Sequence, residues 1–329
     1  MLMQPLFRNK DDQRFFEKNG FLKLKHQFLN DAEIKKLSDL FYGYDNKVES
    51  NRGFYVGMEY KDKSKVKTIM QKIVELVQPK LAALFFNYKP FIANYIVKYP
   101  DTSGVLLPHQ DWTFIEDEVN NYAVTCWIPL VDVGMENGCV GVIRGSHKFL
   151  NSVRPSPSVS NTVSPLVKHS QSLLPYFEWI PMNKGEILLF DYRIFHASLP
   201  NTTDAVRPAI GIWMAENDAK FCHYYSKPGV DNVLLKYKVD EEFYIKYDNN
   251  ILSEMYLQGK VIEDYEISEE INFSFKEISN KEMIEKVTAA GNVKKDIPAS
   301  ILNVLNDDNS RSKIKTFFKK TIYSLFSNA

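Results

Sequence analysis

Near residue 89 the sequence changes from a helical pattern to short apolar runs. This change constrains the possible folds more than any other feature of the sequence. Five runs rich in β-branched and aromatic residues follow: PFIANYIVKYP, YAVTCWIPLVDV, GCVGVI, GEILLFDYRIFHA and RPAIGIWMAE. Turn residues separate them, as at Pro200-Asn201, and no regular helical pattern intervenes. Antiparallel pairing is therefore expected. Such strands within about 130 residues predict a sandwich or barrel of the jelly-roll type.

Helical patterns precede these strands, and we expect the helices to pack outside them. Apolar residues recur at helical spacing in AEIKKLSDLFYGY, which follows Asp31, a residue type that favours the N-cap. A longer helical pattern starts at Lys63 and is expected to bend or break at Pro79. The predicted fold class is therefore mainly β with flanking helices, an α+β arrangement.

Two segments fall outside this pattern. Residues 150–176 are rich in Pro and Ser and show little periodicity, and loops of this length tend to be lids or disordered segments. Beyond residue 230 the sequence becomes more acidic and helical. We therefore predict a β domain with N-terminal helices over residues 1–230, followed by a C-terminal helical extension of unknown role over 231–329.

Charge and cysteine content argue against several classes of protein. The chain has 41 basic and 41 acidic residues, so it shows no electrostatic footprint for nucleic acid. Its three cysteines include no C-x-x-C pair, which argues against a disulfide scaffold or a thiolate zinc site. No apolar run reaches the roughly 18 residues of a membrane span, and the N-terminus turns charged too early for a signal peptide. A soluble, cytoplasmic protein is expected.

The stretch LLPHQDWTF (residues 106–114) places His109 and Asp111 two positions apart. With six His and 41 acidic residues in the chain, about 0.7 His-x-Asp/Glu triplets are expected by chance. The triplet alone therefore fits an ordinary surface turn as well as half of a metal site. On a strand, residues i and i+2 point to the same side, so both side chains would share one face. A facial triad for Fe(II) would still need a second imidazole from elsewhere.

His196 is the residue best placed to supply that imidazole, because it ends the strand-like run EILLFDYRIFH. Arg207 begins the next strand 11 positions later, and a hairpin of that length can bring it back beside His196. A fixed positive charge inside a barrel needs an anionic partner, and a dicarboxylate cosubstrate would supply it. Ser198 lies two residues past His196 on the same face and could share that carboxylate.

Taken together, four features resemble the phytanoyl-CoA dioxygenase family of Fe(II)/2-oxoglutarate oxygenases. They are His109-x-Asp111, ENGCVGVIRGSHK (136–148), FDYRIFHAS (190–198) and Arg207. The resemblance covers roughly residues 10–225 and is strongest from 91 to 215. It implies a double-stranded β-helix, a cupin-like and distorted jelly roll, which agrees with the strand pattern.

The resemblance also implies a set of site residues and a reaction. The iron ligands would be His109, Asp111 and His196, the distal carboxylate of 2-oxoglutarate would be held by Arg207 and Ser198, and further pocket residues would be Trp127, Lys98 and Tyr99. The implied enzyme uses Fe(II), 2-oxoglutarate and O2 to hydroxylate a small or carrier-linked metabolite, with release of succinate and CO2. Because related halogenases replace the carboxylate ligand with a small residue, Asp111 favours hydroxylation over halogenation.

Alternatives stay open at this point. A cupin-like module could bind a metal or an anion without oxygen chemistry, and an oxygenase of this kind could act on a protein or a glycan. The terminal stretch KIKTFFKKTIYSLF places apolar residues on one helical face with lysines around it. That pattern fits weak contact with an anionic membrane surface or a partner protein, and equally a helix packed on the chain itself.

Other titratable residues have ordinary explanations. His147, in RGSHK, is expected to be a hydrogen-bonded turn residue, and His169 and His223 show no partner pattern. Asp191 either orients His196 or closes a turn, and the sequence favours neither. The cysteines in strands are expected to be buried apolar residues.

Overall fold

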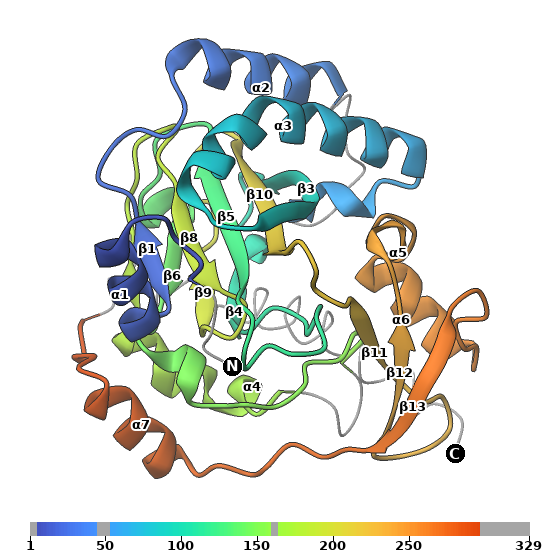
Figure 1. The fold of residues 1–329 in the computed structure, drawn as a ribbon. Helices are drawn as coiled ribbons and strands as arrows, with labels where there is room; N and C mark the ends of the chain where they lie inside the picture. The colour runs from blue at the N-terminus through green and yellow to red at the C-terminus, as the bar shows by residue number, and fades with distance from the viewer. Residues whose placement is uncertain (1–4, 45–52, 159–163, 297–329) are drawn as a thin grey trace.

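Two antiparallel sheets form the centre of the fold (Figure 1), which we describe from a computed structural model covering residues 5–44, 53–158 and 164–296. The larger sheet has the strand order β1-β8-β5-β10-β3-β2, and the smaller sheet has the order β4-β9-β6-β7. In that order the strands of the larger sheet are Phe21–Lys23, Leu188–Asp191, Ala123–Pro129, Arg207–Glu216, Tyr88–Lys98 and Phe54–Val56, and those of the smaller are Leu106–His109, His196–Ser198, Val140–Val142 and Glu178–Trp179. Neighbouring strands within each sheet run antiparallel, as predicted.

An apolar cluster lies between the two sheets. Trp127 and Leu188 enter it from the larger sheet, and Val140 and Val142 enter it from the smaller one. Alternate residues of each strand therefore point into the space between the sheets, where the site residues are found. The predicted fold class, a mainly β jelly roll with flanking helices, is confirmed, although the sheets of the described residues do not close into a barrel.

Helices cover the outer face of the larger sheet (Figure 1). They are α1 (Lys10–Asn19), α2 (Asp31–Tyr44) and α3 (Lys63–Leu84). The side chain of Asp62 caps α3 by accepting hydrogen bonds from the first-turn amides of Ser64 and Lys65. The helix continues through Pro79 without a break, because its buried face, which includes Ile73, Val77 and Leu81, is anchored against the sheet.

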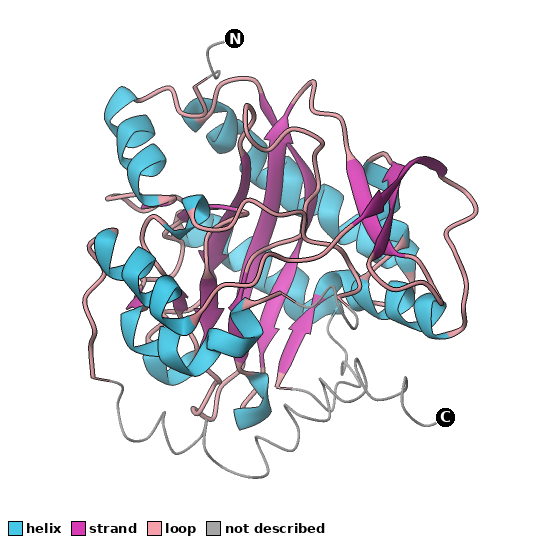
Figure 2. Ribbon diagram, turned by 90° about the horizontal axis from the view of Figure 1, so that it is seen from below, coloured by secondary structure: helices cyan, strands magenta, loops and turns pink. Residues whose placement is uncertain are grey.

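The C-terminal part forms a third sheet beside the central two (Figure 2). It contains the strands β11 (Cys222–Ser226), β12 (Val233–Lys238) and β13 (Glu266–Asn272), and the helices α5 (Glu241–Lys246), α6 (Asn249–Leu257) and α7 (Asn280–Ala289). The segment expected to be a helical extension therefore also contains strands. Its aromatic residues Tyr237 and Tyr244 share one buried cluster with Phe91 of β3. The division into two domains at residue 230 stays a prediction.

The Pro- and Ser-rich segment is not all loop. Residues 151–158 form no helix or strand, but α4 (Leu166–Leu173) lies within the segment, with Leu166 and Leu173 buried against α7. Whether this segment acts as a lid stays a prediction. Among the described residues, no helix has both the length and the apolar character to cross a membrane. The basic terminal stretch lies outside the described residues.

Candidate metal centre

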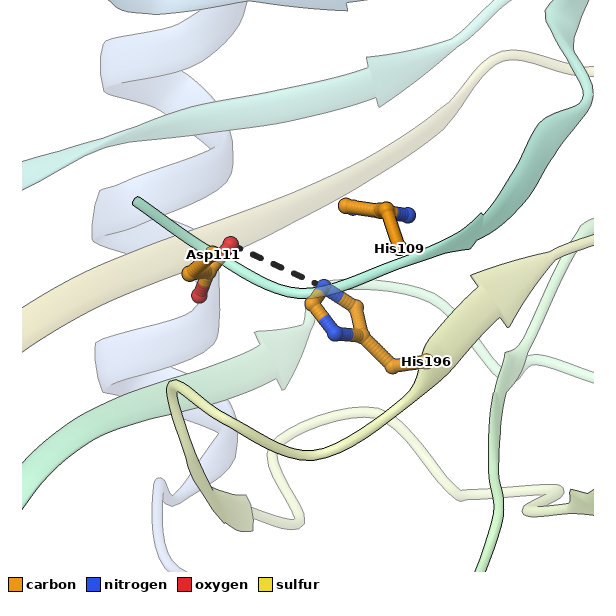
Figure 3. A group of neighbouring side chains, drawn as sticks. All are labelled: His109, Asp111 and His196. Atoms are coloured by element: carbon orange, nitrogen blue, oxygen red, sulfur yellow. Dashed lines mark ion pairs between the residues drawn. The ribbon is translucent and has the colours of Figure 1, made fainter. Parts of the chain in front are cut away.

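Neighbouring strands bring two histidines together across the smaller sheet. His109 ends β4 and His196 begins β9, and the two are directly opposed in the strand register, with ring centroids 4.1 Å apart. Asp111 follows β4, and its Oδ1 lies 3.7 Å from Nε2 of His196 (Figure 3). One donor atom from each of the three residues lies within 4.8 Å of the others, so the group could hold a metal ion.

Backbone carbonyls orient both imidazole rings. Nδ1 of His109 lies 2.7 Å from the carbonyl oxygen of Leu107, and Nδ1 of His196 lies 3.2 Å from that of Ile194. A carbonyl only accepts, so in the neutral ring Nδ1 is the nitrogen that carries the proton and Nε2 the one that keeps a lone pair. Burial, and secondly the neighbouring His196, lower the pKa of His109 to about 3. His109 is therefore neutral at physiological pH, the state in which an imidazole binds metal.

Asp111 is fixed on three sides. Its carboxylate Oδ2 accepts a hydrogen bond from the hydroxyl of Thr125 (2.8 Å), and its amide donates to the carbonyl of Tyr192 (2.9 Å). Its own carbonyl accepts from Nε of Arg154 (2.5 Å). The remaining carboxylate oxygen is the one nearest His196. Because the peptide and one oxygen are held by the protein, the other oxygen is presented to the group with little freedom.

Two basic side chains are buried side by side on the larger sheet. Lys98 of β3 and Arg207 of β10 are direct neighbours in the strand register, and they are only 0% and 2% exposed. Nη1 of Arg207 donates to the carbonyl of Ile96 (3.1 Å), and its guanidinium lies 5.4 Å from the ring of Trp127. Lys98 donates to the carbonyl of Gly104. Neither cation forms an ion pair with a carboxylate anywhere in the described ranges.

The charges of Lys98 and Arg207 favour the binding of an anion between them. Burial lowers the pKa of Arg207, yet a guanidinium keeps its charge in proteins. Burial, and next the charge of Arg207, lower the pKa of Lys98 well below its usual value. Within the described residues, Nε of Arg207 has no hydrogen-bond acceptor. An uncompensated buried charge is costly, so a carboxylate bound here would satisfy both the charge and the free donor.

A scan of the sequence against family models decides the family. Residues 16–209, more than half of the chain, match the model of phytanoyl-CoA dioxygenase (PhyH). The chain belongs to the phytanoyl-CoA dioxygenase family. The resemblance drawn from the sequence motifs is thereby confirmed. With a triad that could hold a metal ion, this phytanoyl-CoA dioxygenase family member is a 2-oxoglutarate-dependent oxygenase that uses iron.

Individual relatives are more distant. The phytanoyl-CoA dioxygenase domain-containing protein 1 homolog of Caenorhabditis briggsae is 25% identical over 261 residues, covering 63% of this chain and 90% of its own. Among solved structures, the carbocyclase SnoK of nogalamycin biosynthesis is 18% identical with a TM-score of 0.49, covering 65% of this chain and 86% of its own. The epimerase SnoN, solved with Fe3+ and alpha ketoglutarate, is 19% identical with a TM-score of 0.44, covering 63% and 83%.

The other predicted pocket residues of this family member differ in position. Trp127 faces the space between the sheets, beside Arg207. Ser198 is buried on β9 opposite Leu106 of β4, two residues from His196. Tyr99 follows the last residue of β3 and packs against the apolar cluster beneath the helices. The role of Tyr99 as a pocket residue stays a prediction.

Sequence reasoning missed two residues of this region. Asn94 lies four residues before Lys98 on β3, on the same face, and neither atom of its buried side-chain amide has a partner among the described residues. Counting back by two along the strand from Lys98 would have found it. Arg154 comes from the Pro- and Ser-rich segment and contacts the carbonyl of Asp111. No local pattern marks that residue.

Three further histidines contact backbone carbonyls and have structural roles. Nε2 of His147 lies 3.2 Å from the carbonyl of Glu17, and His169 and His223 likewise contact backbone carbonyls. Asp191 accepts three hydrogen bonds from the amide and guanidinium of Arg193 and so closes its turn. All three cysteines are buried free thiols.

Proposed function

We propose that this chain is an Fe(II)/2-oxoglutarate-dependent hydroxylase, with His109, Asp111 and His196 as the iron ligands. The observation that carries the proposal is the convergence of one ligand atom each from His109, Asp111 and His196 within 4.8 Å of one another. Two imidazoles and one carboxylate form the ligand set of non-haem Fe(II) oxygenases, which leaves coordination positions open for a cosubstrate and O2. Bound iron with 2-oxoglutarate and O2 supplies the oxidation of a C–H bond, coupled to formation of succinate and CO2.

The two buried cations support a site for the distal carboxylate of 2-oxoglutarate. Arg207 offers an unused Nε donor and Lys98 adds a second positive charge, so together they would bind one carboxylate. Trp127 would form the wall beside Arg207, and the hydroxyl of Ser198 would add a hydrogen bond. Asn94 lies on the same face of β3 as Lys98, and its unpartnered side-chain amide would bind the remaining polar atoms of the cosubstrate.

The protein contributes orientation and a dry surrounding. The carbonyls of Leu107 and Ile194 hold the rings, and Thr125 holds the carboxylate, so the ligands need no rearrangement on binding. The buried ring of Phe190 lies 4.9 Å from the ring of His196 and excludes water from that side. Retention of Asp111 favours hydroxylation over halogenation, because its carboxylate occupies the position that chloride would need.

A small or carrier-linked metabolite is the proposed substrate. The orientation of the proposed ligands favours an enzyme over a plain binding module. The second nitrogen of each imidazole and the second oxygen of the carboxylate already form hydrogen bonds within the protein. The predicted cytoplasmic localisation and the predicted contacts of the terminal basic stretch remain proposals.

The test is anaerobic addition of Fe(II) and then 2-oxoglutarate to the metal-free protein. We expect a visible charge-transfer band from iron to the 2-oxo acid, its loss in Asp111→Ala, and its weakening in Arg207→Ala. Succinate release with candidate substrates then follows in air, with mass spectrometry of the product to detect one added oxygen atom. Iron binding without a band, in protein shown to be folded, would contradict the oxygenase and favour a metal-binding module. A product of altered mass without added oxygen would contradict hydroxylation but leave the oxygenase proposal in place.

A further inference from the structure

Residues 151–158, which we call the strap, run alongside the chain that follows the candidate ligand Asp111. The amide of Thr113 donates to the carbonyl of Arg154, and the amide of Arg154 donates to the hydroxyl of Thr113, both at 3.1 Å. These two contacts run in opposite directions. They fix the position of the strap relative to a residue only two positions beyond Asp111.

The guanidinium of Arg154 reaches back from the strap to the peptide of Asp111 itself. Its Nε donates to the carbonyl of Asp111 at 2.5 Å, and its Nη2 lies 3.4 Å from the carbonyl of Trp112. Its Nη1 donates to the carbonyl of Ser152 (3.0 Å), within the strap. The arginine is 6% exposed. A planar fork with donors on several nitrogens is needed for these three carbonyls, and an ammonium group offers no such geometry.

The charge of Arg154 is balanced by one acid. Its Nη2 lies 2.5 Å from Oε1 of Glu118, and both side chains are buried, at 6% and 11% exposure. Burial raises the pKa of Glu118, while the charge of Arg154 acts in the opposite direction. Such buried pairs are a weak source of stability, because desolvation of both ions offsets their attraction. The distinctive contribution of Arg154 is therefore the position in which it holds the peptide of Asp111.

The other end of the strap is held by the C-terminal part of the chain. The amide of Ser156 donates to the carbonyl of Tyr224 (3.0 Å), and Nε2 of His223 donates to the carbonyl of Ser156 (2.8 Å). The hydroxyl of Ser156 donates to Oδ1 of Asn249 at 2.9 Å. Tyr224 and His223 belong to β11, and Asn249 begins α6. All three lie beyond residue 209, where the family match ends.

We propose that Arg154 is a positioning residue for the metal ligand Asp111, and that β11 and α6 hold the strap on which it stands. The inference rests on the proposed iron site. Tyr192 binds the amide of Asp111 and Thr125 binds its carboxylate, while Arg154 binds its carbonyl. The part of the chain outside the family match thereby acts on the metal site without touching the metal.

Anaerobic titration of the full-length, metal-free protein with Fe(II) tests the proposal. Arg154→Lys keeps the charge opposite Glu118 but loses the fork, and we expect the dissociation constant for Fe(II) to rise roughly 10- to 100-fold. The charge-transfer band with 2-oxoglutarate should weaken in parallel. Arg144→Lys is the matched control, because Arg144 also pairs with a glutamate, Glu178, but contacts none of the three ligands. That variant should bind Fe(II) as the wild type does.

A paired substitution separates positioning from folding. Arg154→Met with Glu118→Met removes both buried charges together, so thermal stability should stay close to that of the wild type. Positioning predicts that Fe(II) affinity remains low in this stable variant. Wild-type affinity in both Arg154→Lys and the paired variant would overturn the role of Arg154. If the wild-type protein binds Fe(II) but forms no band with 2-oxoglutarate, the proposed function is contradicted and the role of Arg154 is not. If the wild-type protein binds no Fe(II), both the proposed function and the role of Arg154 are contradicted.

Ser156→Ala tests the far end of the strap. This variant loses the hydroxyl contact to Asn249 but keeps both backbone contacts, so a smaller rise of the Fe(II) dissociation constant is expected, about threefold. Unchanged affinity would overturn the role assigned to α6 and leave that of Arg154 in place.

Discussion

Lys98 and Arg207 lie directly opposite each other on β3 and β10, and both cations are buried without a carboxylate partner among the described residues. Proteins rarely bury like charges side by side, because each raises the cost of the other. Here the charge of Arg207 is one of the causes that lower the pKa of Lys98. A carboxylate bound between the two side chains would offset this cost, which is why we propose this register position for the cosubstrate.

Arg207→Met should therefore weaken 2-oxoglutarate binding without destabilising the free protein. We expect KM for 2-oxoglutarate to rise by about 100-fold, since a buried charge-assisted contact is lost. The melting temperature without cosubstrate should stay level or rise, because an unpaired buried cation has been removed. Steady-state kinetics and thermal melts of the same preparation measure both effects. A fall in melting temperature with unchanged KM would show that Arg207 is structural.

Gly138 tests the space around Lys98. A Cβ at this position would lie 2.4 Å from the carbonyl oxygen of Leu199 and 2.6 Å from Cδ of Lys98. Gly138→Ala should therefore displace Lys98 and raise KM for 2-oxoglutarate severalfold. Gly229→Ala is the matched control, because Gly229 also has a positive φ, 72° against 81°, but its Cβ would meet open space. Both variants share the backbone strain of about 1 kcal/mol, so their difference in KM reports on the crowding of Lys98 and of the neighbouring Leu199 carbonyl.

Thr125 should matter for metal affinity through Asp111. Thr125→Val keeps the shape of the side chain but removes the hydrogen bond to Oδ2 of Asp111, and we expect the Fe(II) dissociation constant to rise about tenfold. Thr125→Ser restores the hydroxyl and should return most of that affinity. Equal affinity in the valine and serine variants, measured by anaerobic titration, would show that the sheet holds Asp111 without this hydroxyl.

His223 should make the stability of the metal-free protein depend on pH. Burial lowers the pKa of His223 from 6.5 to about 4, although its hydrogen bond to Ser156 acts in the opposite direction. Below pH 6.5 the unfolded chain binds a proton that the folded protein refuses, so the free energy of unfolding falls as the pH falls. The loss from this residue reaches about 3 kcal/mol near pH 4 and becomes negligible above about pH 7.5.

His223→Gln checks this prediction, because glutamine retains a donor for Ser156 and cannot titrate. Urea unfolding of wild type and variant at pH 7.5, 6 and 5, with a chelator present, gives the difference in slope. We expect the two free energies to converge as the pH falls. Parallel pH dependence in the two proteins would assign the acid sensitivity to other groups.

Much of the site was predictable because it depends on local patterns. The change to period-2 apolar runs near residue 89 predicts the antiparallel sheets, since alternation is a property of each strand alone. His109, Asp111, His196 and Arg207 could be singled out because their chemistry is distinctive and each lies at or just beyond a strand end. Their grouping was expected from the predicted fold, and the structure places the three candidate ligands together.

What the sequence by itself determined was the strand pattern and the residue types of the triad, and it predicted an anion near Arg207. Only the tertiary structure decided that Lys98, and not Tyr99, stands opposite Arg207, since this depends on the register between two strands far apart in the chain. It also decided the part played by Arg154, which is 43 residues from Asp111. Contacts at that separation are set by packing and loop closure, and neither leaves a periodic trace in the residues between them.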